Sequence, residues 1–185
     1  MKHLWLAGYI ACILSMLLLA GCDKIPSGGT SSSTGNSSAS TPQKPSGNPP
    51  TAIEESVPIK VYFATHDAQH LVAETHKVKK NAPVLQQSME ALIAGPKNSA
   101  LLAVIPAGTR VKSVHVIDGT AYVDFSSEMI KKGFGGSSME ILTVGAIVNT
   151  LTEFSEVERV QILVEGKKVN TLFGHLDVSD PLSRS

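Results

Sequence analysis

His66 and His70 have the spacing with which two histidines on an α-helix hold a zinc ion. Zinc chemistry of that kind also needs a third ligand and a carboxylate that acts as a base, and Asp67 lies between the two histidines. The segment lies between two runs of β-type sequence, however, so we expect a turn and not the helix that would bring both rings to one face. His76 and His115 could complete a ligand set only if folding brought them close. We therefore predict a solvated turn, with no metal and no cofactor.

Asp124 and Glu128 have the residue types that glycosidases use as a pair of carboxylates. Charged side chains are mostly exposed, so we expect Asp124 on the solvent face of a strand and Glu128 at the start of the following loop. Ser126-Ser127 and Ser137-Ser138 lack the Gly-x-Ser-x-Gly context of a nucleophilic serine. The sequence therefore predicts no catalytic residue.

Gly133-Phe134-Gly135-Gly136 precedes a predicted helix and could cradle an anion at the helix N-terminus. No lysine follows these glycines as it does in a phosphate-binding loop, and no strand precedes them as in a dinucleotide site. We expect a flexible connector.

The charge balance argues against a nucleic-acid partner. The chain has 185 residues with 16 Lys and Arg against 16 Asp and Glu, a formal net charge of zero. One small basic cluster, Lys77, Lys79 and Lys80, interrupts this balance. It could touch anionic lipid or cell-wall polymer, or it could be a charged strand edge that discourages aggregation. The sequence leaves both interpretations open.

Both cysteines, Cys12 and Cys22, lie in the first 22 residues, so the folded region has no disulfide, thiolate zinc site or cysteine nucleophile. Lys2 and the uncharged stretch 4–20 are typical of a signal peptide over residues 1–21. Leu19-Ala20-Gly21-Cys22 matches the bacterial lipobox. We predict that Cys22 becomes an N-terminus carrying diacylglycerol and fatty acid such as palmitate, anchored to the outer face of the cytoplasmic membrane. The alternative is an uncleaved transmembrane anchor.

Residues 22–56 have the composition of a linker, rich in Ser, Thr, Gly and Pro with hardly a large apolar side chain. Such a segment cannot bury enough surface to offset its chain entropy, and we expect it to be disordered. About 34 flexible residues have a root-mean-square span of roughly 30–35 Å. The linker would hold the folded domain clear of the lipid headgroups.

The elements that must position these residues centre on a helix and strand in 136–166. Ser137 and Glu140 have capping-box spacing, which predicts that each side chain binds a backbone N–H of the first turn. An apolar stripe follows at helical spacing, with further apolar residues beside it, so we expect a helix buried on most sides. Its members are Val144, Ile147, Val148, Leu151 and Phe154. Residues 157–164 then alternate as a strand.

The remaining segments predict two hairpins and a second helix. Runs at 59–64 and 71–78 form the first hairpin, and Asp118-Gly119 is a type I′ turn signal between strands 110–117 and 120–125. Asn81 could cap a helix with Pro83 in its first turn, ending at Gly95-Pro96. With a short edge strand in 168–173, the order is β-β-α-β-β-α-β-(β). We predict an α+β fold, a mostly antiparallel sheet with two helices packed on one face.

Five segments in this order resemble the GerMN domain, a family named for a sporulation and spore-germination protein. The resemblance covers about residues 57–178. The segments are Ala91-Leu92-Ile93-Ala94-Gly95-Pro96, Ile105-Pro106-Ala107-Gly108-Thr109, the stretch 116–126, Val148-Asn149-Thr150-Leu151-Thr152-Glu153-Phe154, and the stretch 160–166 with Gly174-His175.

The resemblance implies a GerMN-like domain at 57–178, followed by a polar tail at 179–185, with a fold similar to ring-building modules. It implies non-enzymatic, extracytoplasmic work in sporulation, germination or envelope assembly. The expected partners are the bilayer, through acylated Cys22, and envelope or sporulation proteins, self-association included. A solute- or cell-wall-polymer-binding lipoprotein is the alternative, and an envelope hydrolase is a more remote one.

Overall fold

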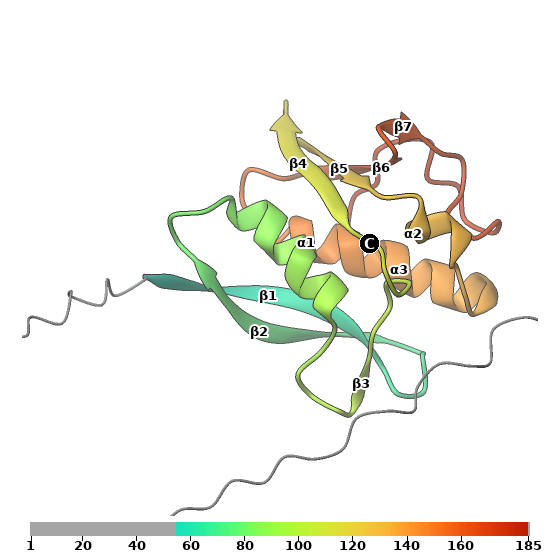
Figure 1. Cartoon of the computed structure of the whole chain (residues 1–185), viewed down its shortest axis with the longest axis horizontal. Coiled ribbons are helices and arrows are strands. Elements are labelled where there is room, and N and C mark those ends of the chain that lie inside the picture. Colours follow the sequence, from blue (N-terminus) through green and yellow to red (C-terminus); the bar gives the residue numbers. More distant parts are fainter. Residues whose placement is uncertain (1–54, 185) are drawn as a thin grey trace, which may run out of the picture. The chain divides into compact units, whose positions relative to one another are not determined.

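The computed structural model describes residues 55–184, and it confirms the α+β class and the order of the main elements (Figure 1). The signal peptide, Cys22 and the linker up to residue 54 lie outside the described residues. Among residues 55–184, no helix has the length and apolarity needed to cross a bilayer. The elements are β1 (Ser56–Thr65), β2 (Leu71–Lys79), α1 (Val84–Ala94), β3 (Leu101–Leu102), β4 (Val111–Ile117), β5 (Thr120–Phe125), α2 (Glu128–Lys131), α3 (Gly136–Leu151), β6 (Arg159–Val164) and β7 (Lys167–Lys168).

The strands form two sheets where the sequence predicted one. One sheet has the order β2-β1-β3 and the other the order β4-β5-β6-β7. All strand pairs are antiparallel except β5 and β6, which the long connection through α2 and α3 brings together in parallel. Alternation along a strand reports which face is buried, but it does not report the neighbouring strand, so the division into two sheets was not visible locally.

Helices α1 and α3 contact strands of both sheets, and Figure 1 shows them between the β1–β2 hairpin and the sheet that contains β4, β5 and β6. Their apolar side chains meet the inner faces of the strands in one core. Its largest fully buried members include Phe63, Met89, Leu92, Phe125, Ile147, Leu151 and Ile162. Helix α3 is buried on most sides, as its sequence predicts.

The predicted type I′ turn between β4 and β5 is confirmed. Asp118 and Gly119 both have positive φ, 48° and 72°, as this turn requires at its two central positions. The close connection sets the register of β4 against β5, from Ile117 opposite Thr120 onward.

The predicted helix starts are wrong in detail. Helix α3 has Gly135 at its N-cap in the left-handed region, φ 82°, and no side-chain capping bond. The capping box of Ser137 and Glu140 does not form, because the Glu140 carboxylate is turned into the protein. At α1 the cap position is Pro83 and not Asn81, again without a side-chain capping bond.

Candidate functional site

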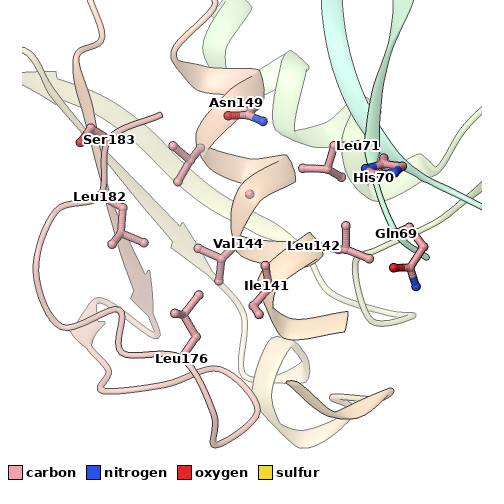
Figure 2. A pocket seen from close by; sticks show the side chains of 12 residues that line it. Gln69, His70, Leu71, Ile141, Leu142, Val144, Asn149, Leu176, Leu182 and Ser183 are labelled. Carbon is pink, nitrogen blue, oxygen red and sulfur yellow. The ribbon is translucent and has the colours of Figure 1, made fainter. Parts of the chain in front are cut away.

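A groove lined by both apolar and polar side chains runs along α3 (Figure 2). We call it the α3 groove. It has a volume of about 560 Å³, with α3 as its floor, the β1–β2 turn as one wall and the C-terminal part of the chain as the other. Its lining residues are Gln69, His70, Leu71, Ile141, Leu142, Val144, Gly145, Val148, Asn149, Leu176, Leu182 and Ser183.

The floor of the α3 groove is uncharged. Helix α3 carries a single charged residue, Glu140, and that side chain is fully buried. The part of the helix that reaches the groove surface is the stripe Ile141, Gly145 and Asn149, spaced by one turn. Ile141 is 57% exposed, more than any other large apolar side chain in the described part of the chain.

Gly145 sets the position of the first wall. A Cβ atom at this residue would lie 3.0 Å from Cδ1 of Leu71, closer than an ordinary van der Waals contact. Glycine therefore allows the start of β2 to pack directly against the helix backbone. The neighbouring Gln69 and His70, at the end of the turn, complete this wall.

Glu140 holds the second wall. The backbone N–H groups of Leu172 and Phe173 donate to its Oε1 (2.9 and 2.8 Å), and those of His175 and Leu176 donate to its Oε2 (2.7 and 3.2 Å). The His175 ring Nδ1 lies 3.1 Å from the same Oε2. Burial acts to raise the pKa of Glu140, but these backbone bonds outweigh it and keep the pKa below its usual range. One buried carboxylate thus orders the loop that carries Leu176.

The rest of the second wall is residues 178–184, which we call the C-terminal strap. Leu182 exchanges backbone hydrogen bonds with Val160 of β6 (2.8 and 2.9 Å), which extends the sheet. The sequence gives this segment as a polar tail, yet Leu182 packs against the core. The predicted edge strand 168–173 also differs from the structure. Only Lys167–Lys168 pairs with β6, as β7, because residues 172–176 turn toward Glu140.

A cluster around Glu153 holds the end of the strap. Its carboxylate accepts hydrogen bonds from the Tyr62 hydroxyl (2.7 Å) and the Arg184 guanidinium (2.6 Å), and it pairs with Lys60 (3.0 Å). Arg184 also donates to the Tyr62 hydroxyl and lies over the Tyr62 ring. The hydrogen bonds from Tyr62 and Arg184 lower the pKa of Glu153 to about 2. A smaller hollow of about 380 Å³ adjoins this cluster, lined in part by Lys60 and Phe154.

The segment with the two closely spaced histidines forms the predicted turn between β1 and β2. Asp67 accepts hydrogen bonds from the Thr65 hydroxyl (2.6 Å) and the Gln69 backbone N–H (3.2 Å), and the Thr65 bond is the main reason why its pKa is lowered. His66 and His70 are both exposed. Within residues 55–184 no three His, Cys, Asp or Glu side chains are grouped as metal ligands.

Asp124 does not lie on a solvent face, so that prediction is wrong. Its side chain is buried and accepts a hydrogen bond from the Gly166 N–H (2.8 Å), because the β6–β7 turn folds over this part of the sheet. Glu128 begins α2 where a loop was expected, and the hydrogen bond to Ser126 and its own backbone lower its pKa. Ser126 Oγ accepts the Arg110 N–H (3.0 Å).

The Gly133–Gly136 connector is packed more tightly than expected. A Cβ at Gly133 would lie 2.4 Å from the Phe173 ring, and the rings of Phe134 and Phe173 lie 6.3 Å apart.

The basic cluster lies at the end of β2, the outer strand of its sheet, where Lys80 pairs with Glu55 (2.7 Å). The connector and the cluster both lie outside the lining of the α3 groove.

The sequence reasoning missed the groove, Glu140 as its organising residue and the strap that walls it. One signal was present: the twelve residues Ile141–Thr152 contain no charged side chain. A core helix gives the same signal, so it could not show that one side of α3 stays open.

Residues 60–170 match the model of the Germane family, described as "Sporulation and spore germination". The chain is 32% identical over 121 residues to the spore germination protein GerM of Bacillus subtilis (strain 168), a match that covers 62% of this chain and 32% of that protein. The chain thus spans about a third of the length of this relative.

Solved structures of GerMN domains have a fold similar to that of this chain. The tandem GerMN domains of Bacillus subtilis GerM match with a TM-score of 0.61 at 26% identity, over 70% of this chain and 46% of that one. The first GerMN domain alone matches with a TM-score of 0.60 at 29% identity, over 69% and 98%. A candidate lipoprotein from Clostridium perfringens matches with a TM-score of 0.51 at 26% identity, over 69% and 87%. The family match covers more than half of the chain, and the chain therefore belongs to the Germane family of sporulation and spore germination proteins.

Proposed function

We propose that this protein is a membrane-anchored, extracytoplasmic lipoprotein whose GerMN domain binds other envelope proteins and catalyses no reaction. Its proposed setting is sporulation, spore germination or envelope assembly. The family description supports the first two of these, and the GerM relative supports spore germination. The lipid anchor and the linker would keep the domain near the outer face of the cytoplasmic membrane and raise its local concentration there.

The observation that supports a binding role over a catalytic one is the use of the buried and half-buried carboxylates. Glu140 accepts four backbone N–H bonds from one loop, and Asp124 accepts the Gly166 N–H. Glu74 accepts the N–H groups of Lys97 and Asn98 (3.0 and 2.9 Å) and lies 2.7 Å from the His76 ring. Each of these acids is engaged in holding backbone in place, whereas a catalytic acid must be free to reach a substrate.

The anchor is supported by the lipobox that ends in Cys22 and by the likeness to the Clostridium perfringens candidate lipoprotein. The test is a Cys22→Ser variant, with Cys12→Ser as the matched control. Metabolic labelling with a tagged fatty acid should mark the wild type and the Cys12→Ser variant but not Cys22→Ser, which should remain a full-length precursor. Normal processing of Cys22→Ser would remove the lipoprotein from the proposal.

The binding role is tested by crosslinking in intact cells, followed by affinity capture of the membrane-bound protein and mass spectrometry. We expect a defined envelope or sporulation protein, and a deletion strain that forms or germinates spores less efficiently. Recovery of the bait alone, together with a cell-wall digestion product that depends on the protein, would overturn the proposal in favour of an enzyme.

A further inference from the structure

We propose that the α3 groove is the surface that receives the partner, and that its occupant is an extended, uncharged and apolar peptide segment of another envelope protein. The segment lies lengthwise along α3 and adds as a strand to the free edge of the C-terminal strap. This inference rests on the proposed binding function and names its surface and the chemistry of its partner.

The groove has the length of a short strand. Ile141 and Asn149 at its two ends are eight residues apart on α3, which is about 12 Å at the rise of an α-helix. An extended chain covers that distance with about four residues. Successive side chains of such a chain point in opposite directions, so alternate side chains would reach the floor between Val144 and Val148.

The strap presents the backbone N–H and C=O of one residue, Ser183, to this strand, because Pro181 on the same edge has no N–H. Leu182 directs both of its backbone hydrogen bonds to Val160 of β6. In an antiparallel pair the adjacent residues point their backbone groups the other way, so the N–H and C=O of Ser183 face away from β6. Ser183 is exposed and lines the groove. A partner strand could bond here and continue the sheet, as in other cases of strand addition.

The chemistry of the lining selects an uncharged segment. The α3 groove has no Asp, Glu, Lys or Arg among its lining residues. Two charged side chains near the groove already have partners within the domain. Glu140 accepts hydrogen bonds from the 172–176 loop, and Arg184 donates to Glu153 and Tyr62. A charged side chain entering the groove would lose hydration without gaining a partner. Apolar side chains would instead cover Ile141, and depletion of charge is typical of the centre of protein interfaces.

The partly open shape favours a protein segment over a small ligand. Pockets for small molecules bury most of the ligand surface, whereas the α3 groove is only partly enclosed. A strand that belongs to a larger partner would be covered from above by the partner itself. The amide of Asn149, at one end of the groove, is then available to backbone groups at the end of the strand.

The test is a selection of random short peptides displayed on phage against the purified full chain. We expect enriched peptides with Leu, Ile, Val or Phe at alternate positions and few charged residues. Fluorescence anisotropy of a selected peptide should show that Ile141→Arg weakens Kd by about tenfold or more. The matched control is Ile117→Arg, because Ile117 is 53% exposed on β4, away from the groove, and this variant should bind as the wild type does.

A second variant tests the strand addition itself. Ser183→Pro removes the N–H on the free edge of the strap. The preceding Leu182 forms an antiparallel β-bridge with Val160, and a residue before proline prefers such a β conformation. This variant should weaken Kd several-fold without changing the thermal unfolding of the domain. Peptide binding that both Ile141→Arg and Ser183→Pro leave unchanged would overturn the inference.

Other occupants give different results. Enrichment of charged peptides, or no enrichment over a bare surface, would overturn the inference. So would concentration-dependent self-association of the full chain that Ile141→Arg abolishes, because the groove would then belong to a second copy. In cells, a partner captured equally by wild type and Ile141→Arg would leave the proposed binding function intact and place its surface elsewhere.

Discussion

Replacing Glu140 with glutamine is the sharpest test of the physical account of this fold. The carboxylate is fully buried, and each of its oxygens accepts two backbone N–H groups of the loop that walls the α3 groove. In Glu140→Gln one oxygen becomes an NH₂ group, which is a donor. Two backbone N–H groups would then face another donor without an acceptor.

The expected loss follows from those two orphaned groups. A buried donor without a partner costs about 1–3 kcal/mol, and losing hydrogen bonds to a charged group is at the upper end. Glu140→Gln should therefore lower the free energy of unfolding by about 2–5 kcal/mol, a large part of the 5–15 kcal/mol typical of a domain. Tm should fall on the order of 10 °C. Urea titration followed by circular dichroism measures the change.

The effect has a defined dependence on pH. The pKa of Glu140 is lowered in the folded protein from a reference value of 4.5, so its stabilising contribution is complete above that value. It is lost as pH falls through the lower pKa of the folded state. The difference between wild type and Glu140→Gln should therefore shrink under acid conditions.

The control and the refuting results are equally specific. Glu156→Gln removes an exposed carboxylate and should change stability by less than about 0.5 kcal/mol. A Glu140→Gln protein as stable as this control would refute the reasoning. So would a difference from the wild type that stays constant from about pH 7 to about pH 3, because the charged form would then not be the stabilising one.

Two further perturbations follow from the same structure. Arg184→Ala should raise the pKa of Glu153 from about 2 toward its usual range, which an NMR titration measures. The same variant should speed amide hydrogen exchange in the C-terminal strap, because Arg184 holds the end of the strap to Glu153. Unchanged exchange at Leu182 would contradict this role of Arg184. Gly119→Ala should lower the free energy of unfolding by about 1 kcal/mol or more, because φ is +72° there and the new Cβ would lie 3.3 Å from Glu158. Asp118→Asn should leave the thermal unfolding nearly unchanged, because asparagine tolerates positive φ. Equal melting temperatures for these two turn variants would be inconsistent with a type I′ turn.

The sequence alone determined the elements whose causes are local. The Asp118-Gly119 turn, the helix that ends before Gly95-Pro96 and the apolar stripe of α3 each depend on residues within a few positions of one another. The family resemblance was also legible, because its segments are short and lie in a fixed order. The prediction that Cys22 carries lipid depends on four adjacent residues and stays a prediction.

Only the tertiary structure decided how the elements combine and which polar groups are taken. Glu140 looked like a local cap, but its partners lie 32 to 36 residues away in the sequence. Asp124 was expected on the solvent face, but the N–H of Gly166 in the β6–β7 turn donates a hydrogen bond to it. The Tyr62 hydroxyl binds Glu153, which is 91 residues away in the sequence. A buried carboxylate needs hydrogen-bond donors, and the donors to Glu140 come from a distant part of the chain. Local spacing therefore predicts helices and turns, while long-range hydrogen bonding decides where a groove opens.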